Sequence, residues 1–289
     1  MSNVTQTELG TVVSLWRYPV KSMLGEELPS AQVRDHGLLG DRAYALLDST
    51  DGKVATAKNP RKWPNLFAFR ATFSESAGSS AQVPPVRITL PDGTVVTSEQ
   101  SDLNQVLSKA LNREVTLAAT ERSPVAGVPS AEPASWTAYA EEYWPDMAGL
   151  DHRDTVTDFA LPAGTFFDCA TVHLLTTATL NRLRDFYPQG RFEVQRFRPN
   201  IVVEPMGSEN GFPENAWIGH TLAIGEEVCL SITGPCGRCV MTTLAQGALK
   251  QDREILRTAV EHNKANVGVY AAVVRGGTVR RGDRVRLGG

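Results

Sequence analysis

Short runs of β-branched and aromatic residues, most of them bounded by glycine or proline, recur along nearly the whole chain. Residues 10–20 and 43–48 form two such runs, and a Pro-Asp-Gly turn at 91–93 separates two more. Runs of this kind predict strands, and the turn predicts a hairpin. Residues 102–112 instead place leucine and valine on one face, which predicts a helix capped by Ser101. Residues 1–120 are therefore expected to form a domain of short strands with one helix.

The composition changes after this point. Residues 121–150 are rich in serine, proline, alanine and acidic residues, which predicts an interdomain linker or lid. Strand-like runs then return at 163–175, 201–203, 221–233 and 267–274. A helix capped by Thr176 or Thr177 is expected after the first of them, and a second helix is predicted over 251–262. Residues 151–289 are therefore expected to form a second domain.

The overall composition excludes several classes of protein. The 289 residues are enough for two domains, and 42% hydrophobic and 21% charged residues are typical of soluble globular proteins. A net charge of −3 provides no basic field for nucleic acid or an anionic membrane. The chain has no apolar run of about 18 residues, and its polar N-terminus is unlike a signal peptide. We therefore expect a cytoplasmic protein with no nucleic-acid partner and no membrane partner.

Two of the four cysteines lie in the Cys-Gly-Arg-Cys sequence at 236–239. The Gly-Pro pair before it predicts a turn, and the Val-Met-Thr-Thr sequence after it predicts the start of a strand. Cys239 is therefore expected where a turn enters a strand, next to the guanidinium of Arg238. A neighbouring positive charge favours the thiolate, which is the form that binds metals or attacks electrophiles. The segment is a candidate for thiolate chemistry.

Three other interpretations of this segment stay open. A thioredoxin-like redox pair requires a helix after the second cysteine, whereas β-branched residues follow it here. A structural zinc site requires four ligands, and Cys169 and Cys229 stand alone in the sequence. A buried and inert cysteine pair is the third interpretation, because a free cysteine behaves as a small apolar residue.

Cationic side chains recur where the predicted strands begin or end. Lys21, followed by Ser22, stands at the exit of the first strand, and Arg42 stands at the start of the next one. Lys58 lies at a proline-containing bend that ends a third segment. Short β-domains place binding groups at such positions, because the scaffold holds their loops.

A further guanidinium and a carboxamide flank a proline before a buried strand. Arg198 and Asn200 are two residues apart, so an extended strand would project both toward one face. The pair suits an anionic group, because arginine offers a planar fork of donors and asparagine adds a donor and an acceptor. Asp168 precedes another strand and is either a turn residue or a site carboxylate.

Five motifs occur in an order that is characteristic of one known family. They are Tyr-Pro-Val-Lys-Ser at 18–22, Gly-Leu-Leu-Gly-Asp-Arg at 37–42, Arg-Phe-Arg-Pro-Asn at 196–200, Cys-Gly-Arg-Cys-Val-Met-Thr-Thr at 236–243, and Val-Gly-Val-Tyr at 267–270 with Gly-Asp at 282–283. With them the chain resembles the MOSC-domain proteins, the molybdenum cofactor sulfurase C-terminal family, preceded by the N-terminal β-barrel domain typical of the amidoxime-reducing group. The resemblance implies a mainly β, α+β fold in two domains, with a β-barrel-like N-terminal domain and a C-terminal MOSC β-barrel.

The resemblance also implies a cofactor and the residues that bind it. In amidoxime-reducing members a molybdenum cofactor, molybdopterin, lies between the domains, and the second cysteine of the C-x-x-C segment binds the molybdenum. That ligand is Cys239 here, and a thiolate suits a metal held by sulfur. Arg238 matches a neighbour of the cofactor, and Asp168 matches a catalytic carboxylate. The residues that would bind the pterin phosphate are Lys21, Ser22, Arg42, Arg198 and Asn200.

The implied reaction is the two-electron reduction of a small N-hydroxylated substrate, an amidoxime or a hydroxylamine, to an amine and water. No plant-type iron–sulfur spacing follows the second domain, so electrons would come from a separate protein of ferredoxin, flavodoxin or cytochrome type. The chain is too short to include the pyridoxal-phosphate domain of the sulfurases, so no pyridoxal phosphate site is expected. Two alternatives stay open: a sulfur carrier that uses a persulfide on Cys239, and a non-catalytic protein that binds the cofactor.

Overall fold

The computed structural model describes residues 7–73, 85–120, 140–144, 155–161, 165–207 and 210–288. They are mostly β-structure, with 41% strand and 19% helix. The strands are β1 (Glu8–Arg17), β2 (Glu26–Leu28), β3 (Ser30–Arg34), β4 (Gly37–Leu38), β5 (Tyr44–Asp48), β6 (Arg70–Phe73), β7 (Val86–Thr89), β8 (Val95–Thr97), β9 (Val115–Ala119), β10 (Ala140–Trp144), β11 (Thr155–Phe159), β12 (Val172–Thr176), β13 (Ile201–Pro205), β14 (Thr221–Ile224), β15 (Val228–Gly237), β16 (Asn266–Arg275), β17 (Gly277–Arg280) and β18 (Arg284–Leu287). The helices are α1 (Leu103–Leu111), α3 (Thr177–Phe186), α4 (Val194–Phe197) and α5 (Glu254–Asn263), with short 3-10 helices η1 (Leu66–Ala68), η2 (Pro213–Trp217) and η3 (Val240–Thr243). The predicted mainly β fold is confirmed.

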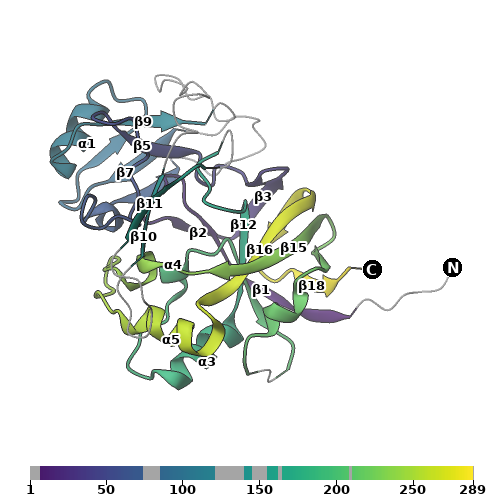
Figure 1. Ribbon diagram of the computed structural model, residues 1–289. Coiled ribbons are helices and arrows are strands. Elements are labelled where there is room, and N and C mark those ends of the chain that lie inside the picture. Colours follow the sequence, from purple (N-terminus) through teal and green to yellow (C-terminus); the bar gives the residue numbers. More distant parts are fainter. Residues whose placement is uncertain are drawn as a thin grey trace.

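Seven strands close into a barrel, and one of them is the first strand of the chain (Figure 1). Their hydrogen-bonding order is β13-β12-β16-β15-β14-β18-β1, and β1 pairs again with β13 to complete the ring. Neighbours are antiparallel except β12 and β13, which are parallel. Apolar side chains that include Leu15, Leu174, Leu222 and Leu230 fill the barrel core. Closure pairs the strand edges that would otherwise be open to other chains.

Strand β1 belongs to the barrel although it comes from the N-terminal part of the sequence. Leu15 is paired with Ile201 on β13, and Thr11 is paired with Arg284 on β18. A Cβ at Gly10 would lie 2.2 Å from the carbonyl oxygen of Glu204, so β1 can approach β13 this closely only with glycine there. The domain bounds 1–120 and 151–289 stay a prediction, and the barrel of the second predicted domain includes a strand from the first.

The rest of the N-terminal part is built from local pairs. Strand β5 pairs with β9, β6 to β8 form a three-stranded sheet, and helix α1 packs on β9. The core of this part includes Phe69, Leu107 and, from the C-terminal half, Met241. Helix α1 begins one residue later than predicted, after Asp102, so the expected cap by Ser101 is wrong. Met241 lies two residues after Cys239, which also packs against this core, so the cysteine segment is packed against the N-terminal domain.

Helices α3, α4 and α5 surround a smaller core beside the barrel. Leu180, Leu183, Phe192 and Ile255 are buried in it. The predicted capping of α3 is confirmed for Thr176, whose hydroxyl accepts a hydrogen bond from the backbone N–H of Thr179 at 3.2 Å. Figure 1 shows α3 and α5 next to each other below the strands of the barrel. Among the helices of the described residues, none combines the length and apolar character that a membrane crossing requires.

A hairpin of β10 and β11 lies in and after the segment predicted as a linker or lid. Ala140 pairs with Phe159 and Trp144 with Thr155, and Ala140 also forms a parallel bridge with Val54. Most of residues 121–150 lie outside the described part of the chain. The described part of that segment is therefore a strand that contacts the N-terminal domain.

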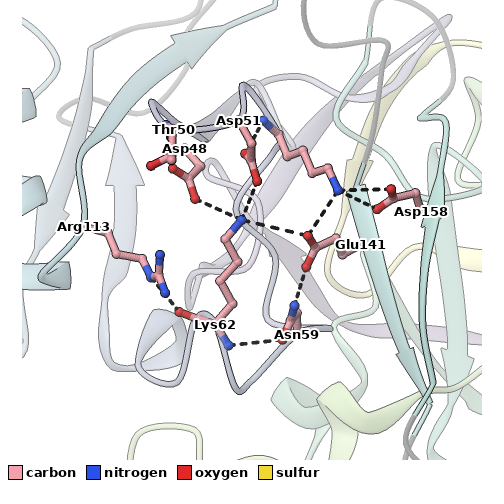
Figure 2. A network of polar contacts seen from close by, with 9 residues as sticks. Asp48, Thr50, Asp51, Asn59, Lys62, Arg113, Glu141 and Asp158 are labelled. Atoms are coloured by element: carbon pink, nitrogen blue, oxygen red, sulfur yellow. Dashed lines mark hydrogen bonds and ion pairs between the residues drawn. The ribbon is translucent and has the colours of Figure 1, made fainter.

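Side chains from both parts form a charged network at this contact, shown in Figure 2. Glu141 on β10 is its hub, with 12% of its side chain exposed. It accepts a hydrogen bond from Asn59 Nδ2 and forms ion pairs with Lys53 Nζ at 3.4 Å and Lys62 Nζ at 3.9 Å. Lys53 also pairs with Asp158 on β11 at 2.9 Å. The network fixes the hairpin to the loops after β5.

Candidate functional site

A cavity of about 280 Å³ lies where the N-terminal strands meet the barrel. It is lined by every candidate residue that the sequence predicted, from both halves of the chain. These are Lys21, Ser22, Arg42, Asp168, Arg198, Asn200, Arg238 and Cys239. The structure therefore brings together residues that are up to 218 positions apart, from Lys21 to Cys239. Their chemical roles stay predictions.

Three of these residues adopt a left-handed backbone. The φ angles are 63° at Ser22, 47° at Arg42 and 53° at Arg198. This conformation costs a residue with a side chain about 1–2 kcal/mol. Hydrogen bonds hold it: Ser22 Oγ accepts from the N–H of Ala57 at 3.1 Å, and the Arg42 N–H donates to the carbonyl of Tyr18 at 2.8 Å. Backbone strain of this kind is frequent at binding sites. The surrounding fold holds the backbone, and with it the side chain, in a conformation that a relaxed loop would not adopt.

The cysteine segment differs from its predicted conformation. The Gly-Pro pair at 234–235 lies within β15, at bulges in its pairing with β16, and is not a turn. Cys239 precedes the 3-10 helix η3, so the predicted strand after it is wrong. Local hydrogen bonds explain the difference, because Thr242 Oγ1 donates to the carbonyl of Cys239 at 3.0 Å and Thr243 Oγ1 donates to that of Val240 at 2.8 Å. Cys239 is therefore held at the junction of a strand and a tight turn.

The guanidinium of Arg238 is directed to the other cysteine. Arg238 Nη1 donates to Cys236 Sγ at 2.8 Å, which the sequence did not predict. Burial raises the pKa of the Cys236 thiol, but the charge of Arg238 and the proximity of His173 outweigh burial and lower the pKa overall. Burial raises the pKa of Cys239, although Lys58 and Arg238 oppose that rise. Burial therefore favours the protonated thiol of the partly buried Cys239.

Asp168 lies between two buried ammonium groups. Lys21 Nζ is 2.5 Å from Asp168 Oδ1 and 2.8 Å from the carbonyl oxygen of Phe166, and Lys58 Nζ is 3.4 Å from Asp168 Oδ2. Burial would raise the pKa of Asp168, but Lys21 and Lys58 hold it well below its usual range. Burial lowers the pKa of Lys21 to about 8, although Asp168 opposes that change. Asp168 therefore lines the cavity as an ionised carboxylate between two lysines, and its role as a site carboxylate stays a prediction.

The Arg-Pro-Asn motif reaches the cavity by a route that the sequence did not predict. Arg198 ends helix α4 in the left-handed conformation, and Asn200 lies just before β13. The prediction that both project from one strand face is wrong, because the backbone reverses at the helix C-cap. Asn200 Nδ2 donates to Asp41 Oδ2 at 2.9 Å, and Asn200 Oδ1 accepts from the N–H of His173 at 3.1 Å. The Asn200 amide therefore connects two cavity walls, while Arg198 stacks 4.2 Å from the ring of Tyr18.

Positive charge exceeds negative charge in the cavity lining. The lining has five cationic side chains and two carboxylates, namely Lys21, Arg42, Lys58, Arg198 and Arg238 against Glu142 and Asp168. Burial and the nearby charge of Arg42 lower the pKa of Arg198 to about 9. In the described part of the chain, the buried Nε of Arg238 has no hydrogen-bond partner. Crowded cations with a free donor suit a bound polyanion, so the lining fits a phosphorylated cofactor.

The cavity includes residues that were not among the predicted site residues. Lys58 was noted only as a cation at a proline bend, and it also pairs with Glu142 at 3.6 Å. Glu142 and Trp144 reach the cavity from β10, and Tyr270 reaches it from β16. Strand β10 was not predicted, because it lies in a segment whose composition is that of a linker. For Tyr270 the signal was the Val-Gly-Val-Tyr motif, which carried no assigned role.

Family models match most of the chain. The model of the MOSC N-terminal beta barrel domain matches residues 9–123, and that of the MOSC domain matches residues 162–286. The chain is a MOSC-domain protein. Both matched segments contribute residues to the cavity, so the site of this MOSC-domain protein lies where the two segments meet.

Two curated proteins and one solved structure show how far the likeness extends. Mitochondrial amidoxime reducing component 2 of Rattus norvegicus is 25% identical over 312 residues, which cover 96% of this MOSC-domain protein and 83% of that one. Molybdenum cofactor sulfurase of Oryza sativa subsp. japonica is 24% identical over 276 residues, which cover 86% of this chain and 30% of the sulfurase. The YUAD protein from Bacillus subtilis aligns over 96% of this chain and 95% of its own, with 10% identity and a TM-score of 0.45.

Proposed function

We propose that this MOSC-domain protein is a molybdenum-cofactor-dependent oxidoreductase that reduces small N-hydroxylated substrates with electrons from a separate donor protein. The observation that supports the proposal most is the convergence of eight predicted residues on one cation-rich cavity that contains a cysteine. A relative named for amidoxime reduction aligns over nearly the whole chain and supports the same class of reaction.

The side chains of the cavity divide into those that hold the cofactor and those that face the substrate. Arg42, Arg198 and Arg238 would bind the phosphate and pterin with charged hydrogen bonds. Cys239 would bind the molybdenum as a thiolate, and its proton is released on binding because metal ligation requires the deprotonated form. When bound, the cofactor supplies the two-electron reduction that removes the N-hydroxy oxygen as water.

Asp168 is the residue best placed to orient the substrate. Its carboxylate is held ionised by Lys21 and Lys58, and 33% of its side chain is exposed. An ionised carboxylate only accepts hydrogen bonds, so Asp168 would accept one from an N–H or O–H group of the substrate. Burial lowers the pKa of Lys21, the partner of Asp168, to about 8, so Lys21 would be the group that donates a proton to the substrate.

The test is molybdenum and pterin content after expression in a host that makes the cofactor. The wild type is compared with Cys239→Ala and with Cys236→Ala, which removes the neighbouring thiol. We expect near-stoichiometric molybdenum in the wild type, loss of it in Cys239→Ala, and retention of most of it in Cys236→Ala. Reduction of an N-hydroxy substrate with an artificial electron donor should follow the same order. If the two variants lost molybdenum equally, or if neither did, Cys239 would not be the ligand.

A second candidate function is sulfur transfer by a persulfide on Cys239. The likeness to molybdenum cofactor sulfurase favours it, although the matched region covers only 30% of that protein. In this case well-folded wild type would contain no molybdenum or pterin, and mass spectrometry would detect one additional sulfur on the peptide that contains Cys239. That result would replace the reductase proposal with the sulfur-carrier proposal.

A further inference from the structure

We propose that Arg196 is a positioning residue. It fixes the turn after Cys239 against the part of the cavity wall that the end of helix α4 forms. Arg196 lies in α4, two residues before Arg198, and is 1% exposed. Its guanidinium is far more buried than an arginine usually is, and it does not line the cavity itself. The inference rests on the proposed role of Cys239 and extends it to a residue to which no function has been assigned.

The guanidinium donates to four backbone carbonyl groups. Arg196 Nε donates to Arg191 at 2.8 Å, Nη1 donates to Thr242 and to Leu244 at 3.1 Å each, and Nη2 donates to Lys250 at 2.7 Å. Three of the four acceptors lie in the segment that follows Cys239. Hydrogen bonds from a charged donor are stronger than neutral ones, so this segment is fixed from one side by a single side chain.

A hydrogen-bonded path of two steps connects Arg196 to Cys239. Thr242, whose carbonyl accepts from Arg196, donates back to the carbonyl of Cys239 through its N–H at 3.2 Å and its hydroxyl at 3.0 Å. Thr242 is fully buried, so water does not compete for these bonds. The direction of the Cys239 side chain is therefore set by a turn whose far end is bound to Arg196.

The two residues that follow Arg196 in the chain form part of the cavity wall. Phe197 and Arg198, which follow Arg196 directly, both line the cavity, and helix α4 packs on η3. Arg196 thus couples the position of the phosphate-binding guanidinium of Arg198 to that of the Cys239 thiol. A cofactor held at its phosphate by one wall and at its metal by the other requires a fixed distance between them.

Lysine cannot replace arginine at this position. An ammonium group is a single point charge, whereas the planar guanidinium donates in several fixed directions at once. Arg196→Lys therefore keeps the charge and removes most of the contacts to the Cys239 segment. Arg17→Lys is the matched control, because Arg17 is also buried, at 4% exposed, and lies outside the cavity lining. Its guanidinium donates to the carboxylate of Glu26 at 2.7 and 2.9 Å and to the carbonyl of Leu39 at 3.2 Å.

The experiment measures the Cys239 segment in the cofactor-free full-length protein and then measures molybdenum retention. Iodoacetamide labelling, read by peptide mass spectrometry, compares Cys239 with the exposed Cys169 as an internal reference. Amide hydrogen exchange follows the N–H groups of Thr242 and Leu244. In Arg196→Lys we expect the Cys239/Cys169 labelling ratio and both exchange rates to rise by about tenfold or more. Molybdenum affinity should fall by about 10–100-fold.

Arg17→Lys should lower thermal stability and leave the labelling ratio, the exchange rates and the molybdenum content unchanged. If Arg196→Lys behaved like Arg17→Lys in all of these, the inference would be overturned. If Arg196→Lys does not fold, Thr242→Val tests the same path, because it removes the hydroxyl bond to Cys239 and keeps the carbonyl that accepts from Arg196. An unchanged Cys239 labelling ratio in Thr242→Val would also overturn the inference. Absence of molybdenum from the wild type would refute the proposed function alone, since labelling and exchange do not depend on the metal.

Discussion

Glu141 offers a direct test of how the β10–β11 hairpin is held over the cavity. Successive residues of a strand point to opposite faces, so Glu141 can bind the loops after β5 while Glu142 lines the cavity. Replacing Glu141 with alanine removes the hub of the network in Figure 2. The hairpin should then lose much of its attachment to the N-terminal domain, and the wall formed by Glu142 and Trp144 should loosen.

The magnitude follows from the contacts that are lost. The hydrogen bond from Asn59 to the largely buried carboxylate is worth about 1.5–3 kcal/mol. The ion pairs with Lys53 and Lys62 are longer and partly exposed, and each adds about 0.2–1 kcal/mol. Both lysines retain other carboxylate partners, Asp158 for Lys53 and Asp48 and Asp51 for Lys62, so neither is left as an unpaired charge. The expected loss of unfolding free energy for Glu141→Ala is therefore about 2–5 kcal/mol.

Urea unfolding measures this loss, and two variants separate its causes. Glu141→Gln keeps an oxygen that can accept from Asn59 and loses the two ion pairs, so it should cost about 0.4–2 kcal/mol. Asp158→Asn removes a 47% exposed partner of Lys53 from the neighbouring strand and should cost about as little. If Glu141→Ala were within about 0.5 kcal/mol of Asp158→Asn, the argument that Glu141 is the hub would be refuted.

Two further predictions concern buried charges. Arg198→Ala should weaken cofactor binding by about 1.5–3 kcal/mol, because one charged hydrogen bond is lost, and the molybdenum that remains after dialysis measures it. Arg198→Lys should lose less molybdenum than Arg198→Ala. Unchanged molybdenum in both variants would remove Arg198 from the phosphate site. Glu214 is fully buried, accepts from the hydroxyls of Thr176 at 2.6 Å and Thr179 at 2.7 Å, and burial raises its pKa. Its contribution to unfolding free energy should be complete below its ordinary pKa of 4.5 and should be lost as pH rises through the higher folded value. The melting temperature of the wild type should therefore fall between about pH 4 and pH 8, and it should fall less in Glu214→Gln. Equal falls in melting temperature with pH for the two proteins would contradict the assignment.

The cavity could be predicted from the sequence because its residues lie in short motifs whose order carried the family resemblance. Neither spacing nor periodicity alone brought Lys21 and Cys239 together. Lys21 was a cation at the exit of one predicted strand, and Cys239 was a thiol where a turn enters another. The resemblance supplied the common site, and the structure shows both residues in its lining.

The local conformation of the motifs was harder to predict. The β-branched residues at 240–243 have high strand propensity, but the hydroxyls of Thr242 and Thr243 bind nearby carbonyls and stabilise a 3-10 turn. At Arg198 the end of a four-residue helix, too short to give a periodic signal, reversed the chain. In both cases hydrogen bonds within a few residues outweighed the propensity of the segment.

Individual side-chain contacts could not be predicted. The role of Glu142 depends on a strand in the predicted linker, and the interaction between Arg238 and Cys236 depends on side-chain direction within a bulged strand. The four acceptors of Arg196 are carbonyl groups, which every residue has, so no residue type indicates them.

The closure of the barrel by β1 has a consequence for how the chain folds as it is synthesised. Strand β1 (Glu8–Arg17) is synthesised long before its partner β18 (Arg284–Leu287), which lies near the other end of the sequence. At about 5–20 residues per second, β1 waits on the order of tens of seconds for that partner. The strands between residues 44 and 119 pair with one another and can fold during that time, while β1 keeps an open edge that could pair with other chains. Strand β1 is therefore made early and is among the last of the described strands to complete its pairing.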